Sequence, residues 1–151
     1  MEIRFDDTDN RFTLRAAALI IHNQQLLVVK NSAANCCYTI GGGVRIGETT
    51  EEAVLRECYE EIGASFVIDR LVFVQERFFT AGGKQHHEVV FFYLMKPCAV
   101  SIVHDQPTDQ ANEMLCWLPL DQLKTAPLVP SFLKEALAKL PQTIAHIVTY
   151  E

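Results

Sequence analysis

The chain has 151 residues, a length that suits one compact domain, so we expect residues 1–151 to fold as a single unit. Hydrophobic residues make up 49% of the chain and charged residues 21%, which supports a buried core and argues against disorder. The 19 acidic residues outnumber the 13 basic ones, and the resulting net charge of -6 argues against general binding to nucleic-acid backbones.

The sequence also argues against a membrane or secreted protein. No apolar run approaches the roughly 20 residues of a membrane-spanning helix, and the first residues, MEIRFDDTDNRF, contain no apolar signal-peptide core. The number of cysteines is odd and the sequence contains no C-x-x-C motif, a pattern typical of reduced thiols. We therefore expect a cytoplasmic protein whose five cysteines are Cys36, Cys37, Cys58, Cys98 and Cys116.

The first half of the chain begins with strand-like segments. Apolar stretches predict strands over 13–21 and 26–30, joined as a hairpin by the polar turn 22–25. A short apolar segment, 37–40, leads into the three glycines 41–43. Three consecutive glycines predict irregular backbone there, with positive φ angles or a close approach to a ligand.

The second half alternates in the same way. Residues 71–79 and 88–95 are rich in Val, Phe and Tyr and predict two strands, with 81–84 as the loop of a hairpin. Another short strand is expected over 114–118, and an amphipathic helix over 130–140. Strands on both sides of a helix indicate an α/β or α+β domain built in layers.

The clearest helix runs from Thr49 to Ile62. Thr49 followed by Glu52 is a capping-box pattern, and Gly63 stands where a left-handed C-terminal cap is expected. On a helical wheel one face is apolar, and it consists of Val54, Leu55, Cys58, Tyr59 and Ile62.

Three carboxylates, those of Glu57, Glu60 and Glu61, share the other side of this helix at spacings of three and four residues. Like charges at such spacings destabilise a bare helix, and Arg56 offsets this only in part. A solvated acidic face is one interpretation. The alternative is a site for Mg²⁺ or Mn²⁺, which bind hard oxygen ligands and would cancel the repulsion.

The segment 42–64, GGVRIGETTEEAVLRECYEEIGA, resembles the Nudix box, G-x5-E-x7-R-E-U-x-E-E-x-G-U with U a bulky apolar residue. The box spans 23 of the 151 residues, and only its two apolar positions, Cys58 and Ala64, are smaller than usual. All fixed positions match, namely Gly42, Glu48, Arg56, Glu57, Glu60, Glu61 and Gly63. The resemblance implies the Nudix α/β/α sandwich, a mixed β-sheet between helices.

The resemblance also implies an activity, the divalent-metal-dependent hydrolysis of a nucleoside diphosphate linked to another group. A pyrophosphate would be repelled by the glutamates unless a cation lay between them, so Mg²⁺, or Mn²⁺ in its place, is the expected cofactor. By the same resemblance Glu57 and Glu61 are metal ligands, and Glu60 contributes to the metal site or to catalysis. Arg56 orients the carboxylates.

Substrate contacts are expected from the loop before the helix. Gly42 and Gly43 shape this loop, and Arg45 either meets a phosphate or is a solvated loop residue. Glu48 either ligates the metal or holds the loop to the start of the helix.

The general base comes either from the box or from a glutamate outside it, and Glu113 and Glu88 are the outside candidates. Three cations on or near predicted strands, Arg15, Lys30 and Arg77, either line the substrate cleft or act as solubilising charges at strand edges.

The substrate is the least determined part of the prediction. Some Nudix branches carry a proline or tyrosine about sixteen residues beyond the box, where this chain has Thr80 and Ala81. By elimination a nucleoside triphosphate or modified nucleotide is favoured, while ADP-ribose and nucleotide sugars stay open. The rival interpretation is a catalytically silent module that binds a nucleotide as a sensor. A homodimer also stays open, through an exposed strand or the tail 144–150.

Overall fold

A computed structural model of the chain describes residues 1–97, 106–108 and 110–151. Cys98 lies outside the described residues. The elements, in chain order, are β1 (Arg4–Asp6), β2 (Asn10–Leu19), β3 (Ile21–His22), β4 (Gln25–Asn31), β5 (Cys36–Gly43), α1 (Thr50–Ile62), β6 (Ile68–Ala81), β7 (Lys84–Met95), β8 (Gln106–Pro107), β9 (Glu113–Pro119), the 3-10 helix η1 (Leu120–Thr125), β10 (Leu128–Val129), α2 (Leu133–Ala136) and β11 (Ala145–Tyr150).

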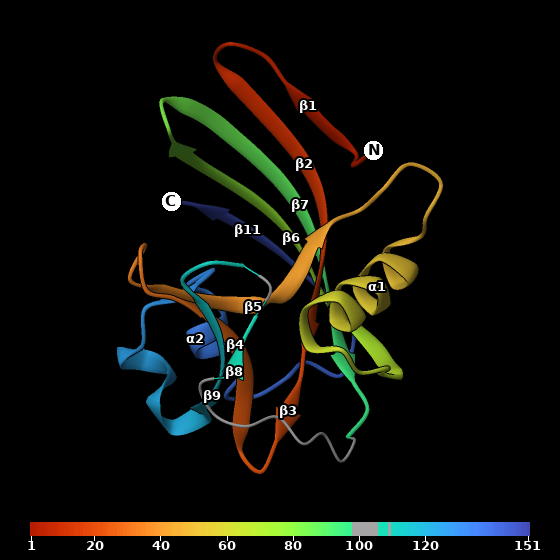
Figure 1. Cartoon of the computed structure of the whole chain (residues 1–151), viewed down its shortest axis with the longest axis vertical. Helices are drawn as coiled ribbons and strands as arrows, with labels where there is room; N and C mark the ends of the chain where they lie inside the picture. Colours follow the sequence, from red (N-terminus) through yellow and green to blue (C-terminus); the bar gives the residue numbers. More distant parts are fainter. Residues whose placement is uncertain (98–105, 109) are drawn as a thin grey trace.

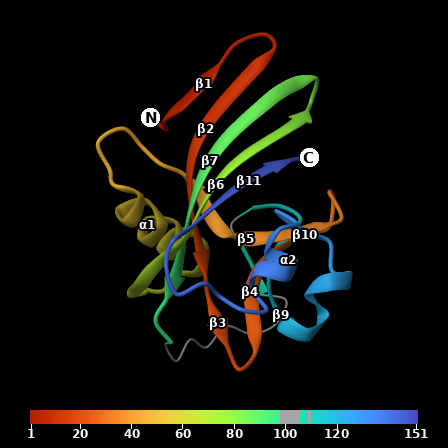
Figure 2. The ribbon, with the colours of Figure 1, turned by 180° about the vertical axis from the view of Figure 1, so that it is seen from behind.

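The strands form a mixed sheet in the order β11-β6-β7-β2-β5-β4-β9-β8. The pairs β2–β7, β6–β11 and β5–β10 are parallel, whereas the neighbouring pairs β6–β7, β2–β5 and β4–β9 are antiparallel. Helix α1 lies on one side of the sheet and α2 on the other (Figures 1 and 2). This arrangement confirms the expected mixed sheet between helices.

Alternation along β2 explains how one strand serves both layers. Ala16 and Ala18 are buried in the cluster that contains Val54 and Cys58 of α1. Ala17 and Leu19 face the opposite way and are buried in the cluster with Leu123 and Leu133. Because both faces of this strand are covered, its sequence is a nearly continuous apolar run.

The predicted strands are present, but the first hairpin is shorter than expected. The turn Asn23–Gln24 has positive φ at both residues and joins only β3 to β4, through the pairs Ile21–Leu26 and His22–Gln25. The long strand β2 pairs with β7 and β5 instead. The hairpin is therefore limited to the last residues of the predicted strand.

The prediction of irregular backbone at Gly41–Gly43 is wrong, because these glycines form the end of β5. Residues Cys36–Thr39 of this strand pair with β4, whereas Ile40–Gly43 pair with β2, so β5 changes partner midway. A Cβ on Gly41 would lie 2.4 Å from the carbonyl oxygen of Ala16 and 2.8 Å from the Cα of Ala17. Glycine is needed here because the two strands approach closely, and none of the three has a positive φ.

Helix α1 has the predicted ends. The Thr49 hydroxyl accepts a hydrogen bond from the Glu52 amide, the Glu52 carboxylate accepts one from the Thr49 amide, and Gly63 caps the helix with φ 79°. The apolar face is confirmed at Val54 and Cys58, which are buried. It is wrong at Tyr59, which is 64% exposed because the buried stripe runs through Ala53 instead.

The C-terminal part departs further from the prediction. The helix expected over 130–140 is a single turn, Leu133–Ala136, flanked by i→i-3 bonds such as Lys134 N–H to Ser131 C=O (3.1 Å) and Ala138 N–H to Glu135 C=O (3.2 Å). The tail after it forms β11, which pairs with β6 of its own chain. Of the helices that the structure describes, none is long and apolar enough to span a bilayer.

Candidate active site

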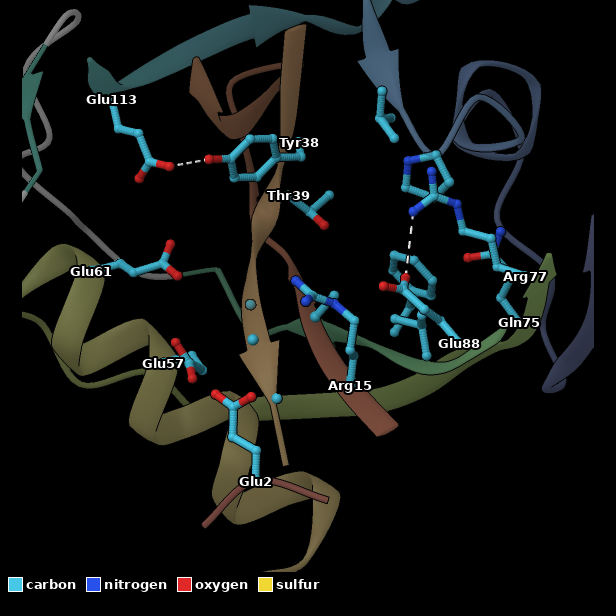
Figure 3. A pocket seen from close by; sticks show the side chains of 18 of the residues that line it. Glu2, Arg15, Tyr38, Thr39, Glu57, Glu61, Gln75, Arg77, Glu88 and Glu113 are labelled. Atoms are coloured by element: carbon cyan, nitrogen blue, oxygen red, sulfur yellow. Dashed lines mark hydrogen bonds and ion pairs between the residues drawn. The ribbon is translucent and has the colours of Figure 1, made fainter. Parts of the chain in front are cut away.

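A cleft of about 530 Å³ opens where β5 changes partner. Glu57 and Glu61 of α1 lie on one side of β5, and Arg15, Gln75, Arg77 and Glu88 lie on the other (Figure 3). Glu113 and Tyr38 border the cleft beside Glu61 (Figure 3). The cleft therefore joins a carboxylate wall to a floor that carries two guanidinium groups.

Arg56 organises the acidic side of the site. Its guanidinium donates to both carboxylate oxygens of Glu48 (2.6 and 3.0 Å), to Glu57 (2.7 Å) and to Glu60 (3.3 Å). It also donates to the carbonyl oxygen of Gly43 at 3.0 Å, which ties the helix to the end of β5. These are the contacts through which Arg56 would orient the carboxylates, and this role stays a prediction.

Glu48 joins the loop to the helix. It accepts a hydrogen bond from the Arg45 amide (2.8 Å) besides those from Arg56, and the Arg56 bonds hold the pKa of its carboxyl at about 2. Glu48 is not among the residues that line the cleft.

Gly42 leaves the space that the Glu57 carboxylate occupies. A Cβ on Gly42 would lie 2.4 Å from Glu57 Oε1 and 2.5 Å from its Cδ, so any side chain there would displace the carboxylate. Gly42 and Gly43 both line the cleft. The close approach that Gly42 permits is thus to the Glu57 side chain of α1.

Glu61 is the most perturbed acid of the site. Burial raises its pKa to about 8, with further contributions from the nearby carboxylates of Glu57 and Glu113. The Gly41 amide donates a hydrogen bond to it and Arg15 attracts its charge, and both act in the opposite direction. A carboxylate that is costly to ionise beside two others is a place where a cation would be stabilising.

The donor chemistry therefore fits a hard divalent cation, although the carboxylates are not drawn together. Among the described residues, no three His, Cys, Asp or Glu side chains already converge as a metal site. Glu57 and Glu61 are the glutamates of α1 that line the cleft, so they are the residues of this helix that would hold a cation there.

The shifted acid predicts an unusual pH dependence of stability in the metal-free protein. Because the folded-state pKa of Glu61 is above its unfolded value of 4.5, the contribution of Glu61 to stability is fully present below about pH 4.5 and is lost as pH rises to about 8. The loss is at most about 1.4 kcal/mol per pH unit. Glu61→Gln should remove this slope, so the variant gains stability over the wild type as pH rises. Urea unfolding with chelator at pH 5, 6.5 and 8 measures the free energy of unfolding of both proteins. The same change of this free energy with pH in wild type and variant would contradict the burial of this charge.

Both outside candidates for the general base line the cleft. The Tyr38 hydroxyl donates a hydrogen bond to Glu113, and burial together with this bond raises the pKa of Tyr38. Glu88 instead lies 3.4 Å from Arg77, and the side chains of this pair are only 12% and 16% exposed. Glu113 borders Glu61, whereas Glu88 belongs to the basic floor (Figure 3).

Besides Glu48 and Arg56, the predicted site residues Glu60 and Arg45 lie outside the cleft lining. Glu60 is 44% exposed and pairs with Arg56 and, at 3.5 Å, with Arg45. Arg45 is itself half exposed. The roles predicted for them stay predictions.

The sequence left open whether Arg15, Lys30 and Arg77 line the cleft or act as solubilising charges. Arg15 on β2 and Arg77 on β6 line it, whereas Lys30 is exposed on β4 and borders a different pocket. Gln75 and Tyr38 were not anticipated, and the only local signal for Gln75 was the polar run 75–77 inside an otherwise apolar part of the strand.

Comparisons with known proteins agree with this architecture. The family model of the NUDIX domain matches residues 12–140, whereas no curated protein matches the chain. The fold is similar to a mutator MutT protein from Bacillus halodurans (TM-score 0.72, 15% identity, 91% of this chain and 89% of that one). It is also similar to a MutT NUDIX hydrolase from Burkholderia pseudomallei (TM-score 0.57, 24% identity, 89% and 90%).

A third similar structure is an ADP-ribose pyrophosphatase from Streptococcus suis (TM-score 0.54, 15% identity, 91% and 98%). At these identities the likeness shows the fold. The family is shown by the domain model, which covers most of the chain and includes the box whose Glu57 and Glu61 line the cleft. The chain belongs to the Nudix hydrolase family, enzymes that hydrolyse pyrophosphate bonds.

Proposed function

We propose that the chain hydrolyses a nucleoside diphosphate linked to another group, with Mg²⁺ or Mn²⁺ as cofactor and the cleft at β5 as the active site. The observation that carries the proposal is the position of Glu57 and Glu61 opposite Arg15 across one cleft. A polyphosphate needs positive charge on both sides, from a cation at the carboxylates and from the guanidinium opposite.

Each residue has a separate task in this reaction. Glu57 and Glu61 would hold the cation, with Glu60 close by on the same helix. A cation held there would supply neutralisation of the phosphate oxygens and would make the attacking water more acidic. Glu113 is our first choice to take the proton from that water, because it borders Glu61 and is oriented by Tyr38. Arg56 keeps Glu57 in place through their 2.7 Å contact.

Arg15 should bind the phosphates of the substrate. Replacing it with glutamine is expected to lower kcat/KM about tenfold or more, since a charge-assisted contact to phosphate is lost. Lys30→Gln is the matched control, because it removes an equal charge from an exposed position outside this cleft. Steady-state kinetics of both variants checks the prediction, and equal losses would point to a general effect of charge.

The substrate is proposed to be a nucleoside triphosphate or a modified nucleotide, with ADP-ribose and nucleotide sugars as the nearest alternatives. Phosphate and pyrophosphate release from a panel of these compounds and of dinucleoside polyphosphates, with Mg²⁺, Mn²⁺ or chelator, tests it. Release that requires metal supports the hydrolase and identifies its substrate. Nucleotide binding without hydrolysis of any compound would instead support a sensor.

The remaining parts of the proposal are a single domain and a cytoplasmic location, which rest on chain length and the cysteine pattern. A small-molecule nucleotide is the expected partner. Because the tail strand β11 pairs within its own chain, a homodimer formed at this edge would use the outer side of β11.

A further inference from the structure

Gln75 is a buried polar residue that the proposed reaction does not use. Its side chain lines the cleft and is fully buried (Figure 3). The carboxamide nitrogen donates to the Thr149 hydroxyl at 2.9 Å, but Oε1 has no hydrogen-bond partner within the described part of the chain. A buried acceptor without a donor is costly and uncommon, so it indicates a partner that enters from outside.

The sheet places Gln75 at a fixed distance from Arg15. Gln75 of β6 stands opposite Val90 of β7, and Val90 stands beside Arg15 of β2, so the three share one face of the sheet. Two strand spacings separate Gln75 from Arg15, which is about 10 Å. A nucleotide whose phosphates lie at Arg15 would reach Gln75 with its base.

The surroundings of Gln75 suit a planar base. Val90 and Phe92 are apolar and buried, and Val129 and Pro130 add apolar surface to the same cleft. Pockets of this kind, apolar with a few polar groups, bind small organic ligands. Contact with Gln75 requires neighbouring side chains to shift, because Gln75 is fully buried.

The polar groups at this end of the cleft include two acceptors. Gln75 contributes Oε1, and Glu88 contributes a carboxylate whose side chain is 12% exposed. Glu88 lies two residues from Val90 on β7, hence on the same face as Gln75. An amino group carries two N–H donors and can serve both acceptors, whereas a ring N–H can serve only one.

We propose that Gln75 determines base specificity, by accepting a hydrogen bond from the exocyclic amino group of the substrate's nucleobase. This inference rests on the proposed function, because it takes the phosphates to lie between Arg15 and the glutamates. It assigns the substrate to the amino-bearing bases, and it makes β11 a positioning element through Thr149.

The test compares nucleotides that differ by an amino group in place of a carbonyl, CTP with UTP and ATP with ITP. Wild-type kcat/KM is expected to favour the amino member of each pair by about tenfold or more. Gln75→Leu should bring both ratios close to one. Glu76→Gln is the matched control, because Glu76 is the next residue on β6 and faces the other side of the sheet, where it contacts His146 at 2.6 Å.

Equilibrium binding of the same nucleotides separates this inference from the proposed function. If no nucleotide is hydrolysed but the amino members bind more tightly and Gln75→Leu removes the preference, the hydrolase proposal fails and the role of Gln75 stands. If the wild type hydrolyses both members of each pair with the same kcat/KM, the role of Gln75 is wrong. The same holds if Gln75→Leu keeps the wild-type preference for the amino members. Thermal unfolding of Gln75→Leu checks its fold, and the wild-type ratios alone can overturn the inference if that variant does not fold.

Discussion

Replacing Glu57 or Glu61 with glutamine is expected to abolish hydrolysis while leaving the fold intact. Glutamine has the shape of glutamate, so packing against Gly42 and the contact with Arg56 can persist, but the negative charge is lost. A site that loses a charge on which transition-state stabilisation depends slows by on the order of 10²–10³-fold. We expect at least this loss for each variant, since both residues would hold the same cation.

The control for these variants is Glu51→Gln, which removes an exposed carboxylate from the first turn of the same helix. Its rate should stay within about twofold of the wild type, since surface changes away from a site have small effects. Circular dichroism and thermal unfolding show whether all variants are folded. Substantial activity in both Glu57→Gln and Glu61→Gln would contradict the assignment of the cation site.

Replacing Arg56 with alanine is expected to give the largest loss of stability at the site. The guanidinium bonds to three carboxylates and one carbonyl oxygen, and its removal leaves Glu48 and Glu57 without the cation that contacts both of them. Breaking a fully buried ion pair costs about 3–5 kcal/mol. Arg56 is 19% exposed and Glu48 17%, so solvent screens part of the charge and we expect about 2 kcal/mol.

This stabilisation should depend on pH in the opposite sense from that of Glu61. The pKa of Glu48 falls from 4.5 to about 2 in the folded state, mainly through its bonds to Arg56. The contribution is therefore complete above pH 4.5 and is lost as pH falls to about 2. Urea unfolding at pH 7 and pH 3 should give a smaller difference between wild type and Arg56→Ala at pH 3. Arg56→Lys should fall between them, because lysine keeps the charge but not the fork.

The helix of the box was predictable because its signals are local. Thr49, Glu52 and Gly63 determine its ends through contacts within a few residues, and both caps form as expected. The spacing of Glu57 and Glu61 likewise brings both to one side of the helix. Which glutamates line the cleft is not local, because Glu60 turns to Arg45 and Arg56.

The glycines before the helix show what a local reading misses. Gly41–Gly43 were expected to be irregular, yet they are strand residues. Glycine is needed at Gly41 and Gly42 because β2 and the Glu57 carboxylate leave no room for a Cβ there. That reason depends on strands and a helix far apart in sequence. The same holds for the floor of the cleft. Arg15 of β2 and Gln75 of β6 come together there because both strands pair with β7.

The segment 130–140 was expected to be a helix because its apolar residues recur at helical spacing. Leu133 and Leu137 are indeed buried, but their burial needs only one helical turn. The chain then runs through turns and bends to residue 144, and β11 begins only at Ala145, beyond the predicted helix. Burial of two leucines, not a long amphipathic helix, is what the apolar spacing of this segment reports.

The central claim is that the carboxylates of this cleft catalyse hydrolysis through a divalent cation. The most direct measurement is the rate of hydrolysis of the best nucleotide with Mg²⁺, with chelator and after Mg²⁺ is restored, for the wild type and Glu57→Gln. We predict wild-type turnover that disappears in chelator and returns with Mg²⁺, and no turnover in the variant under any condition. A wild-type rate unchanged by chelator, or a Glu57→Gln rate equal to that of the wild type, would contradict it.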